Sequence, residues 1–116
     1  MTNKIQLKTV LSETAGVSVP QSTLFALLSL GILDSLTSGL LSATDTLQFF
    51  FHAENCLFVR QHLHSRNADE IMSHGVQLPD LFDILPPTEA QREFQRELAK
   101  MRTLCLTLLE EKQQVI

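Results

Sequence analysis

A long stretch in the first half of the chain is almost free of charge, and it limits the possible folds more than any other feature. Asp34 is the only charged residue between Glu13 and Asp45, and leucine and isoleucine recur through residues 24–41. Their spacing follows the period of an α-helix and predicts a helix that starts near Ser22. Because this helix is apolar almost all round, it must be covered on several sides, by other helices or by a second copy of the protein.

A stripe of small residues runs along this predicted helix. Gly31, Ser35 and Gly39 recur every four residues, so they share one side of the helix. Small side chains allow the backbone of another helix to approach closely. We expect the stripe to pack inside one subunit, with a seam between two subunits as the alternative.

The charge-poor stretch also raises the question of a membrane span. Asp34 lies at its middle, and a carboxylate inside a bilayer costs roughly 2.5 to 3.5 kcal/mol. Near the N-terminus, Lys4 and Lys8 are not followed by the apolar run of a secretory signal. Cys56 and Cys105 lack the close spacing of a disulfide or zinc framework. We therefore expect no membrane span and a cytoplasmic protein with free thiols.

A second predicted helix covers residues 47–63, after a break near residues 42–44. Either Thr44 or Asp45 can cap its first turn. On a helical wheel its apolar side chains occupy two faces, so we expect this helix to be central or shared between subunits.

Polar residues interrupt these apolar helices. Glu54 and Gln61 fall inside one apolar face of the second helix, and Asp34 lies within the first. A carboxylate in such surroundings must be paired, protonated or placed at a pocket or interface. We take His52, Glu54, Gln61 and Asp34 as candidate ligand or interface residues. For the two acids we prefer a structural explanation, either an ion pair or a position at an exposed gap.

The second half of the chain predicts two more helices. Asn67 can cap a short helix that runs through His74, where Gly75 supplies a left-handed stop. A proline-rich connector follows, and Thr88 caps the last helix. The last helix has apolar residues at alternating intervals of four and three, which predict a heptad-like seam: Phe94, Leu98, Met101, Cys105 and Leu108.

The histidines and cysteines give little support to a metal site. All four histidines lie between His52 and His74, but no two are three or four residues apart. His52 and Cys56 lie one turn apart, and two ligands do not close a zinc site. The chain has no Gly-rich phosphate loop and no nucleophile elbow. We expect no cofactor and no enzymatic activity; the alternative is a small-ligand or metal site centred on His52, Glu54 and Cys56.

The net charge of −4 at pH 7 gives no long-range attraction to nucleic acid, so we do not expect nucleic acid as a partner. Arg60, His64 and Arg66 belong to the only locally basic stretch, which precedes a predicted helix N-terminus where an anion could bind. Because acidic residues follow closely, we prefer to interpret them as solvated surface charges.

These patterns predict a single all-α domain over residues 1–116, a small bundle of about four helices joined by short turns. Residues 1–19 suit either a strand or a short helix, and we expect a helix. The two apolar helices favour a homodimer. Because no convergent polar groups are found, we expect a non-enzymatic protein-interaction or regulatory domain.

Overall fold

The computed structural model describes residues 4–13 and 19–113, and within these ranges every regular element is an α-helix. The prediction of an all-α fold is confirmed, but the described residues form six helices rather than about four. The bounds are α1 Leu7–Glu13, α2 Gln21–Thr37, α3 Ala43–Phe49, α4 Ala53–His62, α5 Arg66–Ile84 and α6 Pro87–Gln113.

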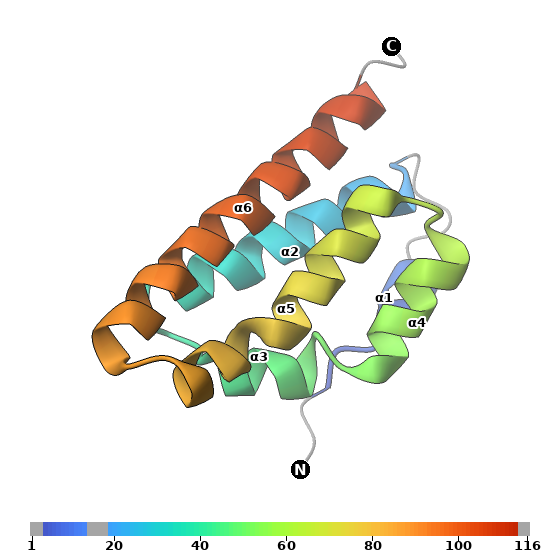
Figure 1. Cartoon of the computed structure of the whole chain (residues 1–116). Coiled ribbons are helices and arrows are strands. Elements are labelled where there is room, and N and C mark those ends of the chain that lie inside the picture. Colours follow the sequence, from blue (N-terminus) through green and yellow to red (C-terminus); the bar gives the residue numbers. More distant parts are fainter. Residues whose placement is uncertain (1–3, 14–18, 114–116) are drawn as a thin grey trace.

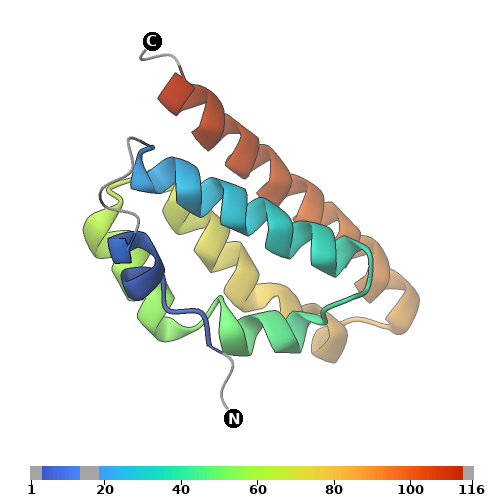
Figure 2. The same ribbon diagram turned by 180° about the vertical axis from the view of Figure 1, so that it is seen from behind.

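Three long helices form the body of the molecule. The longest, α6, packs against both α2 and α5, and it runs in the opposite direction to α2 (Figure 1 and Figure 2). The short helices α3 and α4 pack on α5, while α1 contacts α4 and α2. One apolar core contains residues from all six helices. No helix formed by the described residues combines the length and the apolar character that crossing a bilayer requires.

A break separates α3 from α4, so the predicted continuous helix over residues 47–63 is wrong. The backbone N–H groups of Phe50 and Phe51 both donate to the carbonyl of Thr46, at 2.9 and 2.8 Å. Both phenylalanine rings are fully buried, edge to face, with centroids 5.0 Å apart. Adjacent residues on a continuous helix point about 100° apart, and the break allows both rings to enter the core.

The connection between α2 and α3 is capped at both ends. Gly39 has a φ of 79°, and the N–H of Leu40 returns to the carbonyl of Ser35 at 3.0 Å, which ends α2 in a Schellman motif. Ser42 caps α3 through a capping box with Asp45, with contacts of 3.0 and 3.2 Å. These caps fix the loop that forms one wall of the cleft described below.

Helix α5 continues through Gly75, so the predicted short helix that stops at this glycine is wrong. It starts earlier than predicted, because the hydroxyl of Ser65 rather than the side chain of Asn67 caps it and accepts a backbone N–H at 3.1 Å. Gly75 packs against the ring of Phe51 so closely that a Cβ atom would overlap the ring. The glycine therefore serves close packing and not a turn.

Helix α6 confirms the predicted heptad-like seam. It starts at Pro87, so Thr88 lies in its first turn rather than ahead of it. Proline suits this first position because its missing N–H would have no partner inside the helix. The seam residues are all at most 6% exposed: Phe94, Leu98, Met101, Cys105 and Leu108.

Candidate functional site

His52, predicted as a ligand or interface residue, has a structural role. It is 9% exposed and caps α4. Its Nε2 lies 3.0 Å from the carbonyl oxygen of Ile5, and its Nδ1 accepts the backbone N–H of Asn55 at 3.4 Å. A ring that carries its proton on Nε2 satisfies both contacts. A metal ion could bind this histidine only if one of these bonds were given up.

Asn55 is the central polar residue of this region, and the sequence analysis did not single it out. It is 1% exposed, and its amide nitrogen donates to the carbonyls of Ile5 and Phe50, both at 2.8 Å. Its amide oxygen accepts the N–H of Leu7 at 3.0 Å, at the start of α1. The bonds attach the N-terminal segment to α4. A helix was expected within residues 1–19, and α1 forms one over Leu7–Glu13, while residues 1–3 and 14–18 lie outside the described ranges. The sequence signal that could have pointed to Asn55 was its place three residues after His52, as an amide among apolar residues.

Glu54, Gln61 and Asp34 are all exposed, so the expectation that they interrupt buried faces is wrong. The helical wheel carried one phase through residues 47–63, but the break before α4 changes that phase. Asp34 lies instead on the solvent side of α2. None of these three side chains needs a buried partner. Neither of the two acids forms an ion pair within the described chain.

The alternative site centred on His52, Glu54 and Cys56 is not brought together. Cys56 is half-buried, with its sulfur 3.9 Å from the carbonyl oxygen of Phe51. Burial raises the pKa of the Cys56 thiol, and the charge of Arg60 opposes this shift. Across residues 4–13 and 19–113, no three His, Cys, Asp or Glu side chains gather in a way that could hold a metal ion.

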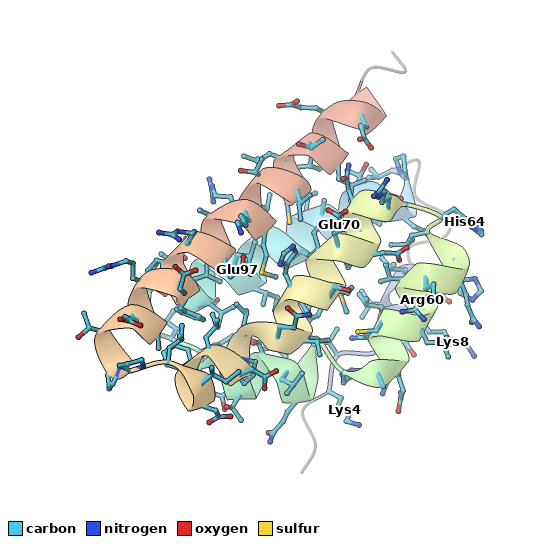
Figure 3. All side chains as sticks on the ribbon, viewed as in Figure 1. Lys4, Lys8, Arg60, His64, Glu70 and Glu97 are labelled. Atoms are coloured by element: carbon cyan, nitrogen blue, oxygen red, sulfur yellow. The ribbon has the colours of Figure 1, made fainter. Side chains whose placement is uncertain are left out.

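The candidate anion-binding residues lie on the surface around α4. Arg60 and His64 point outward on the same side of the molecule as Lys8 (Figure 3). Arg66 is 92% exposed and pairs with Glu70 at 3.6 Å, one turn along α5. Arg60, His64 and Arg66 are all exposed, and their interpretation as solvated surface charges stays a prediction.

The predicted stripe of small residues does not pack inside the subunit. Gly31 is exposed, and a Cβ atom built on it would meet nothing within 4 Å. Gly39 lies beyond α2 and ends the helix. Figure 2 shows α2 in front, with no other described helix crossing over it. We define the outer face of α2 as Leu24, Leu27, Leu28, Gly31, Ser35 and Ser38.

This outer face is apolar at one end and lined by small residues at the other. Leu27 is 52% exposed, and Leu24 and Leu28 are half-buried. Ser35 and Ser38 follow beyond Gly31. Helix α2 carries a single charged residue, Asp34, over its 17 residues. Leu27 is thus the exposed leucine of this face, with the half-buried Leu24 and Leu28 beside it.

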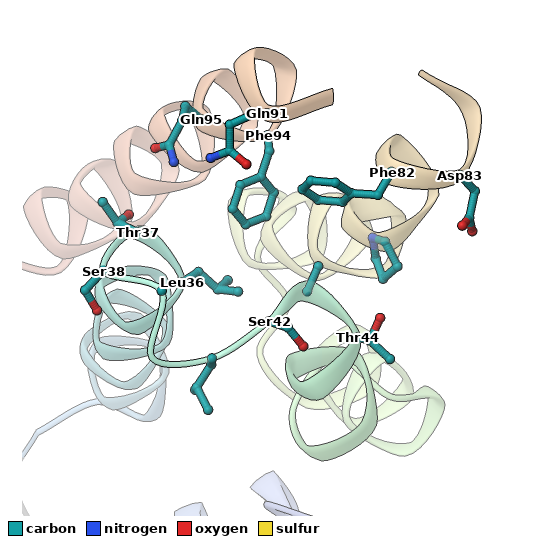
Figure 4. A pocket seen from close by; sticks show the side chains of 14 residues that line it. Leu36, Thr37, Ser38, Ser42, Thr44, Phe82, Asp83, Gln91, Phe94 and Gln95 are labelled. Atoms are coloured by element: carbon teal, nitrogen blue, oxygen red, sulfur yellow. The ribbon is translucent and has the colours of Figure 1, made fainter. Parts of the chain in front are cut away.

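A cleft of about 520 Å³ lies at the end of the molecule where four segments meet (Figure 4). The end of α2 and its loop, the start of α3, the end of α5 and the start of α6 form its walls. Leu36, Ala43 and Phe94 are buried apolar residues of its lining. Phe82 is 46% exposed and packs edge to face on Phe94, with ring centroids 5.2 Å apart.

The other lining residues of the cleft are mainly neutral and polar: Thr37, Ser38, Ser42, Thr44, Gln91 and Gln95. Asp83 is its only charged lining residue. A cleft with hydrogen-bonding side chains around the Phe82–Phe94 pair is suited to binding a ligand or a peptide. A single acid without a basic partner is a poor basis for catalysis. The sequence predicts a connector at Phe82. It gives no signal that the four segments that form the cleft lie together.

The chain matches no protein-family model, no curated protein and no solved structure. The outer face of α2 and the cleft are therefore the two surfaces that point to a function.

Proposed function

We propose that this protein is a non-enzymatic protein-interaction domain that works in the cytoplasm as a homodimer, with the outer face of α2 as the dimer contact. The observation that carries the proposal is the outer face of α2, where Leu27 is 52% exposed and the space around Gly31 is open. A monomer leaves this face in water, and a helix packed on it would remove the face from water.

The outer face is complementary to itself when two copies of α2 run antiparallel. Its N-terminal half presents leucines, its C-terminal half presents serines, and Gly31 lies between them. A twofold axis at Gly31 places Leu27 of one copy opposite Ser35 of the other, and Leu24 opposite Ser38. Bulky side chains thus fill the space left by small ones, and the two backbones approach closely at the glycine.

The size of this face indicates a reversible dimer. A helix of 17 residues is about 25 Å long. A contact of that length and one helix wide buries on the order of 1,000 to 1,200 Å² in total, at the lower end for specific complexes. We expect a dissociation constant in the micromolar range, so that a change in concentration or a competing partner would regulate assembly.

Sedimentation velocity tests the dimer. The average mass should rise from that of the 13.0 kDa chain toward twice that value between about 1 and about 200 µM. Leu27→Glu should stay monomeric, because it places carboxylates against an apolar surface. Leu57→Glu is the matched control, since Leu57 on α4 is 51% exposed, and it should assemble like the wild type. A wild-type chain that stays monomeric throughout, or equal behaviour of the two variants, refutes the proposal.

Gly31→Ala separates dimer packing from subunit packing. The added methyl meets open space inside the subunit and favours the helix, so the dilute monomer should be stabilised by about 0.5 to 1 kcal/mol. The same methyl groups face each other at the dimer axis, so the dissociation constant should rise about threefold or more. Thermal unfolding at low concentration and sedimentation measure the two effects. An unchanged dissociation constant would place the contact elsewhere.

A further inference from the structure

Two strongly exposed apolar residues are sequence neighbours of residues that line the cleft. Leu40 and Ile84 are 79% and 77% exposed, the highest values among the large apolar residues, and Phe82 between the walls is 46% exposed. Leu40 stands between two lining residues of the α2–α3 loop, and Ile84 directly follows the lining residue Asp83. Phe82 therefore offers exposed apolar surface in the cleft itself, and Leu40 and Ile84 offer more on the two segments that form its walls.

The one charged group that lines the cleft is a carboxylate. Asp83 lines it, and Asp80 lies one turn earlier on α5, exposed like Asp83. Neither carboxylate belongs to an ion pair in the part of the chain that the structure describes, whereas Glu70, Glu93 and Glu97 all do. No lysine or arginine is among the lining residues. The complementary partner therefore carries a positive charge beside an apolar group.

We propose that the cleft binds a segment of a partner protein that inserts one bulky apolar side chain against Phe82 and Phe94 and places a lysine or arginine beside Asp83 and Asp80. The aromatic pair supplies the apolar anchor of the contact, and such anchors in pockets carry most of the binding energy of interfaces. The two carboxylates select the sign of the flanking charge. Thr37, Ser42, Gln91 and Gln95 offer hydrogen bonds to the backbone of the bound segment. This site goes beyond the dimer contact, with which it shares only Ser38.

The test is a selection of displayed random peptides of about 15 residues against the full chain. A counter-selection uses Phe82→Ser, which removes the exposed ring and keeps the net charge. Peptides retained by the wild type and lost on this variant should share a bulky apolar residue with a lysine or arginine about one helical turn away or less. Gln95→Trp should also abolish their binding, because it fills the mouth of the cleft and leaves Phe82 in place. This second variant keeps the test valid if Phe82→Ser unfolds.

Titration of the selected peptides then tests the acidic groups. Asp83→Asn and Asp80→Asn should each weaken binding about twofold to fivefold at low salt. Glu110→Gln, an exposed acid at the other end of α6, should leave binding unchanged. The proposal is overturned if no selected peptide loses binding to both Phe82→Ser and Gln95→Trp. It is also overturned if the peptides that do so show no enrichment of lysine or arginine. It is also overturned if Phe82→Ser abolishes the dimer, because a second copy then occupies the cleft.

Discussion

The side chain of Asn55 bonds three backbone groups, and its removal should show how much these bonds stabilise the fold. Asn55→Ala leaves the carbonyls of Ile5 and Phe50 and the N–H of Leu7 without this partner. Because Asn55 is 1% exposed, we expect a loss of about 2 to 4 kcal/mol in the free energy of unfolding, measured with urea. Asn67→Ala is the control, since Asn67 makes one exposed bond to Glu111, and it should cost less than about 0.5 kcal/mol. Equal losses would contradict the structural role of Asn55.

Gly75 illustrates a residue that must stay small. Gly75→Ala improves helix propensity, but the new Cβ overlaps the fully buried ring of Phe51. We expect the overlap to dominate and to lower the free energy of unfolding by about 1 to 3 kcal/mol. Phe51→Leu in the same chain should recover part of this loss, because the smaller side chain makes room. If Gly75→Ala instead stabilises the fold, as Gly31→Ala should, then the ring of Phe51 leaves room for a methyl group at position 75.

At the scale of elements, amphipathic pattern predicts helices well and their ends less well. The apolar run of α2 and the seam of α6 each repeat over several turns, so their helices follow from the sequence alone. The break between α3 and α4 does not, because it is made by the burial of Phe50 and Phe51 in a core that the local sequence does not contain. This break also explains why Glu54 was placed on a buried face.

Helix α5 shows the opposite error, in which a local breaker is overruled. Gly75 and Pro79 both suggest that a helix ends, yet α5 continues through both. Proline lacks the N–H that would bond to the carbonyl of Gly75, so the helix gives up one hydrogen bond. Packing of α5 against α6 and α3 compensates for this loss. The cleft was not predictable for the same reason, since Phe82 meets Phe94 only because α5 reaches Ile84.

At the scale of the whole molecule, one apolar core connects all six helices. A chain of 116 residues with a single core is expected to unfold in one cooperative step. The α2–α6 and α5–α6 packing carries most of this core, whereas α1 is attached through Leu7, Leu11 and the bonds of Asn55. Leu27 and Phe82, on which the two proposed contacts depend, are 52% and 46% exposed, so variants at these positions should alter binding more than folding.

The thiol of Cys105 can test this cooperativity. Cys105 is fully buried in the seam of α6, and burial raises its pKa to about 12, with Arg102 opposing the shift only in part. At pH 8 the native thiol is then almost entirely protonated. In a Cys56→Ser chain at low concentration, Cys105 should react with Ellman's reagent only after unfolding, because unfolding exposes the thiol and returns its pKa to about 8.5. The free energy from the labelling rate should therefore equal that from urea unfolding. A clearly smaller value would mean that α6 opens by itself and that the core is not one cooperative unit.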